Sequence, residues 1–233
     1  MNMPINRAII EQTTFDSAMP TGTAVVVHRF EQAGQYDVSI TRGDEVIDQQ
    51  RLNVPEQGAS GQGEAQAAEP AQPGGAISVD LRSIVFNPAA DRLLAVPAGG
   101  YVAFTAPAGP ISLGATIARA DAAGGDLEFD SQRLRAGDLF AVTPIRPGRY
   151  TASNTTTGAS LEIRVTYPVI GPAPFRPPGP ASVECTADGF SADTVTLAPA
   201  QGVIFRVSTE TRIQIELAEP DDGPSPPAGP AAN

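Results

Sequence analysis

Short runs in which hydrophobic and polar residues alternate recur along this chain of 233 residues. They are rich in Val, Ile, Thr, Phe and Tyr, and Gly or Pro separates them, which is the pattern of short strands joined by turns. Residues 149–153 and 212–217 alternate strictly, which indicates sheets with one buried and one hydrated face. No segment shows the period of an amphipathic helix. The pattern therefore predicts an all-β protein.

The predicted strands are short and follow one another at about ten-residue intervals, a spacing typical of β-sandwiches. They are residues 23–29, 36–41, 50–54, 77–86, 92–96, 101–105, 111–117, 138–142, 149–153, 161–167, 182–186, 194–197, 203–207 and 212–217. The 23 Gly and 23 Pro residues supply the turns between them.

The chain contains an internal repeat. Residues 15–41 reappear as residues 129–155 without a gap, and both copies begin with Phe-Asp-Ser. A second similarity relates residues 92–104 to residues 194–205, both of which run strand, Pro-Ala-x-Gly, strand. Repeats of this kind indicate a duplicated structural unit.

Three segments have no residues for a core. Residues 56–75 are rich in Gly, Gln, Ala and Glu, without an aromatic or β-branched residue, and predict a flexible linker. Residues 168–180 are dense in proline and predict an extended, semi-rigid spacer. Residues 220–233 have nothing to bury and predict a disordered tail.

Residues 76–167 resemble a cupredoxin domain. The segment 84–104 (IVFNPAADRLLAVPAGGYVAF) is similar to the family's opening, where an F-x-P strand leads through a Pro-Ala-Gly turn to the next strand. The segment 134–167 is similar to its closing half, with a Gly-Asp turn, a P-G-x-Y turn and a final strand. The resemblance implies a Greek-key β-sandwich.

The repeats then suggest a division of the chain into two such sandwiches. Residues 1–55 resemble only the closing half of the pattern, and residues 181–219 resemble only its opening half. Either half alone would bury too little apolar surface to be stable. We therefore interpret them as one discontinuous cupredoxin-like domain, closed within the chain or between chains, into which residues 76–167 are inserted as a second.

The residues at the family's copper-binding positions argue against a metal. Cupredoxins bind copper through two His, one Cys and a weak axial ligand. Ile40 and Asn154 occupy the positions of the Cys, and Gly43 and Thr157 occupy those of the second His. The whole chain has one His and one Cys. We predict no metal and no cofactor.

The other residues capable of chemistry have structural interpretations. His28 lies in a valine-rich strand, at the position equivalent to Val142, and is predicted to be a half-buried structural histidine. Cys185 is predicted to be a small buried hydrophobe. Tyr36 and Tyr150 each follow a turn glycine by two residues, as in the tyrosine corner of sandwich folds, which predicts buried rings.

Three groups of neighbouring acids are candidates for acid–base catalysis. We assign Asp44 with Glu45, and Asp126 with Glu128, to solvated turns, and Asp221 with Asp222 to the tail. No nucleophile motif accompanies His28. The sequence therefore predicts no catalytic residue and no enzyme.

The charge of the chain limits its partners. Its net charge is −11 and its 15 cations are all Arg, which opposes binding to nucleic acid and to anionic membranes. No run has the length of a membrane span, and the start lacks the apolar core of a secretory signal. A single cysteine allows no internal disulfide. We expect a cytoplasmic protein or one assembled into a larger particle.

These observations predict a non-enzymatic structural or adaptor protein that binds other proteins through sheet edges and loops. The setting would be a larger assembly such as a virion, a surface layer or an enzyme complex, and self-assembly stays open. A carbohydrate-binding module is the alternative, weakened because the chain has no Trp and only four Tyr. A copper or redox protein is a further alternative.

Overall fold

The computed structural model describes residues 7–56, 76–80, 94–106, 112–120, 126–167 and 175–223. These residues form 17 strands and one helix, α1 (Arg7–Ile10), which confirms the all-β class. Within the described residues, α1 is the only helix and has a small fraction of the length needed to cross a membrane.

The strands form three sheets. Sheet A has the order β1 (Thr14–Asp16), β17 (Ile213–Pro220), β11 (Gly148–Asn154), β12 (Ser160–Val165), β15 (Thr194–Leu197). Sheet B has the order β14 (Gly189–Phe190), β13 (Ala181–Thr186), β16 (Val203–Val207), β10 (Leu139–Val142), β2 (Ala24–Arg29), β7 (Tyr101–Thr105), β5 (Ala76–Asp80). Sheet C has the order β6 (Leu94–Ala95), β4 (Glu45–Val54), β3 (Gly34–Arg42), β8 (Gly114–Arg119), β9 (Leu127–Asp130).

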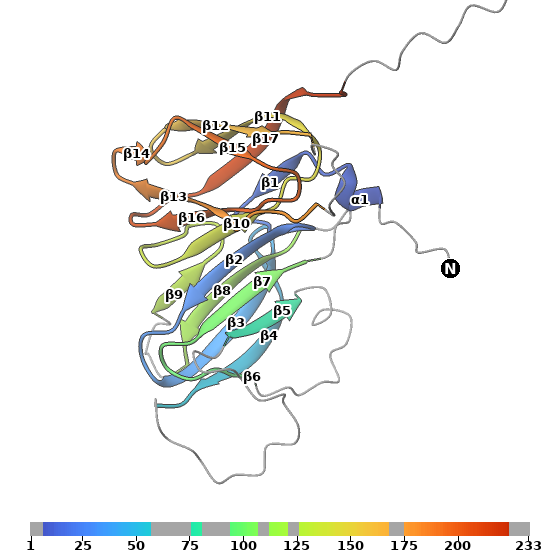
Figure 1. The fold of residues 1–233 in the computed structure, drawn as a ribbon. Coiled ribbons are helices and arrows are strands. Elements are labelled where there is room, and N and C mark those ends of the chain that lie inside the picture. Colours follow the sequence, from blue (N-terminus) through green and yellow to red (C-terminus); the bar gives the residue numbers. More distant parts are fainter. Residues whose placement is uncertain are drawn as a thin grey trace, which may run out of the picture.

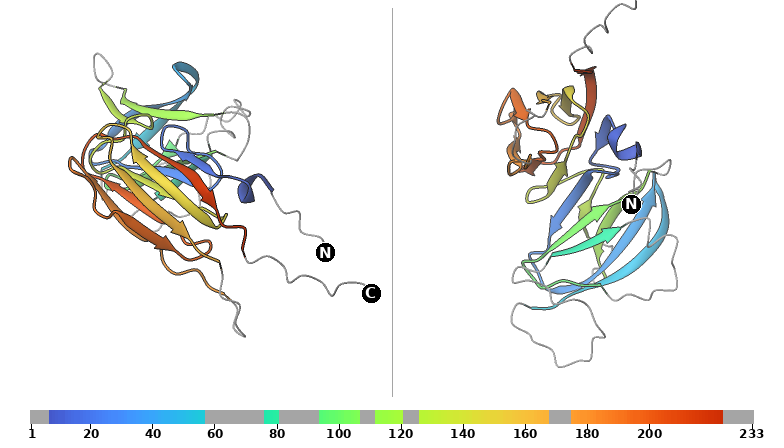
Figure 2. Two further views of the ribbon diagram at one scale, coloured as in Figure 1. Left: turned by 90° about the horizontal axis from the view of Figure 1, so that it is seen from above. Right: turned by 45° about the vertical axis from the view of Figure 1, so that its right-hand side comes forward.

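The sheets are arranged as two lobes, which Figure 1 shows one above the other. In the first lobe, drawn in blue and green, strands β2, β7 and β5 of sheet B face sheet C, and Figure 2 shows these layers from two further sides. In the second lobe, drawn mainly in yellow to red, strands β10, β16, β13 and β14 face sheet A. The rings of Phe104 on β7 and Phe129 on β9 stack at 5.5 Å between the two layers of the first lobe.

Sheet B runs through both lobes because β2 pairs with β10 at its centre. Val26 lies opposite Phe140 in this antiparallel pair. These two residues occupy equivalent positions in the sequence repeat. The repeats are therefore related by a local two-fold axis between β2 and β10. We call this pair of strands the seam.

The two repeats have exchanged their first strands. Strand β1 pairs with β17 in the second lobe, where Phe15 lies opposite Ile215. Strand β9 pairs with β8 in the first lobe, where Phe129 lies opposite Ile117. Figure 1 shows the blue strand β1 among the red and yellow strands of sheet A. Each lobe is completed by a strand of the other repeat.

The expected division of the chain into a discontinuous and an inserted domain is wrong. Residues 24–54 pair with strands between 94 and 119, and not with residues 181–219; only the short β1 reaches β17. The sequence repeat does not determine which halves pair. Two similar opening halves are present in the chain, and each closing half could pair with either of them. The observed pairing brings both closing halves together at β2 and β10, which joins the lobes in one sheet.

Most of the predicted linker and tail residues lie outside the described residues, namely 57–75, 168–174 and 224–233. Residues 175–180 are exposed and have no regular secondary structure, as expected for a spacer. The fold extends past the predicted start of the tail. Pro220 ends β17, and the Asp221 amide donates to the Pro147 carbonyl at 3.1 Å.

The two tyrosine corners predicted from the sequence are confirmed. The rings of Tyr36 and Tyr150 are completely buried. The Tyr36 hydroxyl donates to the Gln32 carbonyl at 2.9 Å, and the Tyr150 hydroxyl donates to the Arg146 carbonyl at 2.8 Å. Each phenol thus fixes the turn that precedes its own strand.

Candidate functional site

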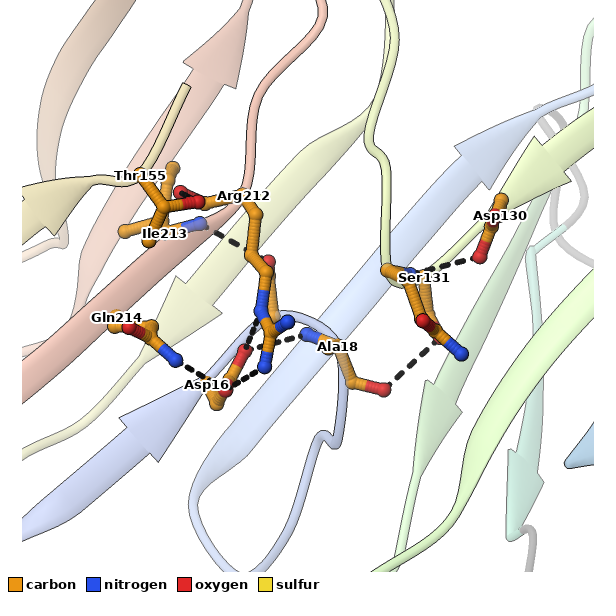
Figure 3. A network of polar contacts seen from close by, with 10 residues as sticks. Asp16, Ala18, Asp130, Ser131, Thr155, Arg212, Ile213 and Gln214 are labelled. Atoms are coloured by element: carbon orange, nitrogen blue, oxygen red, sulfur yellow. Dashed lines mark hydrogen bonds and ion pairs between the residues drawn. The ribbon is translucent and has the colours of Figure 1, made fainter. Parts of the chain in front are cut away.

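A network of polar contacts holds the exchanged strand β1 on β17 (Figure 3). Asp16 accepts hydrogen bonds from Arg212 Nε at 3.0 Å and Nη2 at 2.6 Å, and from Gln214 Nε2 at 2.9 Å. The Ala18 amide donates to the same carboxylate at 2.9 Å. Burial alone would raise the pKa of Asp16, but these hydrogen bonds and the charge of Arg212 lower it below its ordinary value. Asp16 therefore stays ionised and pairs with Arg212.

The serine of each Phe-Asp-Ser copy is completely buried. Each one forms a hydrogen bond with the strand on which the exchanged strand lies, β17 for Ser17 and β8 for Ser131. Ser17 Oγ accepts from the Ile213 amide at 3.1 Å. Ser131 Oγ accepts from the Ala115 amide at 3.0 Å and donates to the Ala18 carbonyl at 3.1 Å (Figure 3). The motif that marks the sequence repeat is thus the element that fixes the strand exchange.

The two exchange sites differ at the position of Arg212. The pairing register places Gly114 on β8 where Arg212 stands next to β17. A Cβ atom on Gly114 would lie 2.8 Å from Thr41 Oγ1 and 3.0 Å from Ser131 Oγ, so a side chain has no space there. Asp130 accepts from the Gln132 amide at 2.9 Å, as Asp16 does from the equivalent Ala18 amide. The ion pair of the first exchange has no equivalent in the second.

The residues at the cupredoxin ligand positions have other contacts. Ile40 is buried in β3, and Gly43 forms the following turn with a φ of 60°. Asn154 is buried at the end of β11, and its Oδ1 accepts from the amides of Thr156 and Thr157 at 3.0 and 3.2 Å. In the part of the chain that the structure describes, no three His, Cys, Asp or Glu side chains are placed to hold a metal ion.

Cys185 is a buried free cysteine on β13, which confirms the predicted small buried hydrophobe. Burial, together with the charge of Glu184, raises the pKa of its thiol from 9.0 to about 12. We therefore expect no reaction with a thiol-specific disulfide reagent in native protein at mildly alkaline pH, because the thiolate is about a thousandfold rarer than for an ordinary cysteine. Unfolding in urea should release one reactive thiol per chain, and rapid labelling without urea would contradict the expectation.

His28 is more buried and more polar in its contacts than the sequence predicted. Its exposed fraction is 7%, and its ring packs against Phe30 and Phe129 at 5.1 and 5.2 Å. Nδ1 lies 2.7 Å from Asp138 Oδ1, and Asp138 Oδ2 accepts from the Arg135 amide at 2.8 Å. Nε2 is buried, lies 3.8 Å from Glu128 Oε1, and has no hydrogen-bond partner.

The register of the seam explains this cluster. Val27 lies opposite Leu139, so the next residues, His28 and Asp138, face each other just beyond that pair. The two-fold axis relates them to the pair of Val142 and Ala24 at the other end of the seam. One end of the seam is therefore ionic and the other apolar.

The charge of His28 follows from its two carboxylate neighbours. Burial alone would lower its pKa, but the hydrogen bond with Asp138 and the nearby charge of Glu128 outweigh burial and raise the pKa above 6.5. The two carboxylates of Asp138 and Glu128 thus favour the imidazolium form of His28. His28 joins three elements: β2, the turn before β10, and the exchanged strand β9.

The stability of the protein is expected to fall as pH rises through the raised pKa of His28. A raised pKa in the folded state means that the contribution is complete below the ordinary pKa of 6.5 and is lost above the folded pKa. Urea unfolding at a series of pH values measures this loss. A double variant, His28→Val with Asp138→Ala, is the control and should lack it. Equal pH dependence in both proteins would contradict the role of His28.

A polar cleft of about 840 Å³ lies beside this cluster, and we call it the seam cleft. It is lined by residues from both repeats, including His28 of the first and Asp138 of the second, and by Tyr101 on β7. Arg29, Arg119, Arg135 and Arg206 also line it, together with five carboxylates. The cleft gathers cations and anions in one place.

The candidate acid groups fall in three different settings. Asp44 with Glu45 is exposed at the β3–β4 turn, as predicted. Asp221 and Asp222 are also exposed, and Asp222 pairs with Arg146 at 3.2 Å. The assignment of Glu128 to a solvated turn is wrong, because Glu128 lies in β9 with its side chain only 23% exposed. No sequence pattern predicts the contact between Glu128 and His28, because the two residues are distant in the chain.

Comparisons of this chain with protein-family models, with curated proteins and with solved structures find no match. The cupredoxin resemblance therefore stays a prediction.

Proposed function

We propose that this protein is a non-enzymatic structural or adaptor protein, which binds other proteins through metal-free, cupredoxin-like sandwiches within a larger assembly such as a virion, a surface layer or an enzyme complex. The observation that carries this proposal is the outer edge of β15 in sheet A. The partner would add an extended segment to this edge as a further strand.

Strand β15 has an edge ready for pairing. It pairs in parallel with β12, and in the described part of the chain no strand pairs with its other side. Its sequence, Thr-Val-Thr-Leu, has none of the charges or prolines with which proteins usually protect an edge strand. An edge without these features is a template for another chain.

The backbone groups that face outward can be identified. The carbonyls of Asp193 and Leu197 accept from Glu162 and Thr166, which places the odd-numbered residues toward β12. Since successive residues of a strand point their N–H and C=O groups to opposite sides, those of Thr194 and Thr196 point outward. Both threonine side chains are exposed, so a partner can reach this edge.

The rigidity of the fold also supports a structural role. The continuous sheet B and the two exchanged strands tie the lobes together, and the Asp16–Arg212 pair fixes one of the exchanges. A partner bound at β15 would therefore be held in a fixed orientation to the whole molecule.

Affinity capture of partners from the native source by the tagged full-length chain, followed by mass spectrometry, tests the proposal. The wild-type chain should capture a discrete partner or further copies of itself. Thr196→Pro should abolish capture, because it removes an outward N–H without removing a bond to β12. Thr196→Val is the matched control, which keeps the N–H and should capture as the wild type does.

Two outcomes would contradict the proposal. If nothing is captured above the background of an unrelated tagged protein, the adaptor role fails. If Thr196→Pro captures the same partner as the wild type, the β15 edge is not the binding site.

A further inference from the structure

The seam cleft lies apart from the β15 edge and combines a buried, charged group with a wide polar rim. None of the residues of β15 lines it. His28 supplies the buried group: Nε2 has no hydrogen-bond partner, and the side chain is only 9% exposed. Glu128 covers Nε2 from 3.8 Å, which is too long for a hydrogen bond.

Glu128 can uncover this nitrogen. Its side chain is 23% exposed and belongs to β9, the outermost strand of sheet C. A change of its rotamer would move the Glu128 carboxylate away from His28 Nε2 without any movement of the backbone. A hydroxyl group that enters there accepts a hydrogen bond from the imidazolium and donates one to the Glu128 carboxylate, so it satisfies both.

Two arginines on the rim of the cleft, Arg29 and Arg135, can bind an anionic group of a ligand. Arg29 donates weakly to the Gly99 carbonyl at 3.4 Å and lies 5.9 Å from the centre of the Tyr101 ring. Arg135 Nη1 donates to the Leu127 carbonyl at 2.6 Å. Neither has a carboxylate within ion-pair distance in the described part of the chain, whereas Arg51, Arg133, Arg146, Arg149, Arg164, Arg206 and Arg212 all do.

The balance of charge in the cleft selects the kind of anion. Four guanidinium groups and His28 face five carboxylates, among them Glu31, Asp126 and Glu184. A phosphate or nucleotide concentrates several negative charges on neighbouring oxygens and would be repelled by these acids, whereas an oligouronate carries one charge per sugar ring. A ligand with single carboxylates and many hydroxyls fits, because Arg29 and Arg135 bind carboxylates and the remaining acids accept from hydroxyls.

We propose that the seam cleft binds a hydroxylated carboxylic acid of the uronic-acid class, presented by a short acidic oligosaccharide. The carboxylates lie against Arg29 and Arg135, one sugar ring packs on Tyr101, and a hydroxyl bridges His28 and Glu128. This site is additional to the protein-binding edge and does not depend on it.

Isothermal titration calorimetry of the full-length chain at low ionic strength tests the site, with galacturonic acid trimer as the probe. The wild type should bind one trimer per chain. Arg29→Gln and Arg135→Gln should each weaken binding about tenfold or more, as expected for a lost charged hydrogen bond. Arg133→Gln is the matched control: it makes the same change in net charge near Arg135, but Arg133 pairs with Glu210 and does not line the cleft. Its affinity should equal that of the wild type.

Four results would overturn the proposal. The wild type could fail to bind the trimer, or all three variants could lose affinity equally, which would indicate general charge attraction. Triglutamate could bind as tightly as the trimer with the same response to Arg29→Gln and Arg135→Gln, which would assign the cleft to acidic protein segments. The uncharged galactose trimer should give no binding, and equal binding of it would exclude the role of the arginines.

Discussion

Tyr150→Ala is expected to lower the free energy of unfolding by about 3–5 kcal/mol, the cost of removing a large aromatic side chain from a core. The Tyr150 ring is completely buried on β11 and lies 6.4 Å from the ring of Phe15, which belongs to the exchanged strand β1. Its loss therefore leaves a cavity beside the strand exchange as well as an unpaired Arg146 carbonyl. The urea midpoint of the variant measures the effect.

Two further variants separate the stability that comes from packing of the Tyr150 ring from that which comes from the hydrogen bond of its hydroxyl. Tyr150→Phe keeps the ring and should cost only about 1 kcal/mol, the net worth of one hydrogen bond. Tyr167→Ala is the surface control, since Tyr167 is 40% exposed, and should stay within about 0.5 kcal/mol of the wild type. An unchanged midpoint for Tyr150→Ala would mean that the ring is not part of the core.

His28→Val is expected to destabilise the protein by about 3–5 kcal/mol, although it makes His28 identical to its repeat equivalent Val142. The reason is its partner: Asp138 is only 2% exposed, and without His28 its charge stays buried with the Arg135 amide as its remaining hydrogen-bond donor. Breaking a buried ion pair by removing one member costs far more than the pair contributes.

The double variant His28→Val with Asp138→Ala should recover most of this loss. It copies the apolar pair of Val142 and Ala24, which the two-fold axis places at the other end of the seam. Exchanging a whole buried ion pair for apolar residues is often neutral. Urea unfolding of the two single variants and the double variant forms a complete cycle. A double variant no more stable than His28→Val would show that the two residues act independently.

The sequence predicted the local structure better than the arrangement of its parts. Alternation and turn residues located most strands and both tyrosine corners, because these depend on neighbours in the chain. Strands β1, β9 and β14 were missed. β1 and β14 have three and two residues, too few for a period to be seen, and β9 has four. The conformation of β1 is set by pairing with β17, which lies far away in the sequence, whereas β9 pairs with β8, the strand before it.

The seam cluster could not be predicted for a related reason. An alignment of the two repeats matches each residue with the one 114 positions later, so it matches His28 with Val142. The two-fold axis instead brings His28 to Asp138, which alignment matches with Ala24. A buried contact between the copies is therefore invisible to any comparison of one copy with the other. The one sign of this contact in the sequence is that the two copies differ at both positions. His28 corresponds to Val142, and Asp138 corresponds to Ala24.

The strand exchange constrains how the chain can be synthesised and folded. Residues 14–16 are made about 200 residues before their partners at 214–216. Pairing between such distant segments is slow, and unpaired strand edges in the waiting chain are prone to misassembly. The nascent protein therefore leaves β1 unpaired until β17 has been made, and we expect chaperones that bind unpaired strands to raise its yield on expression.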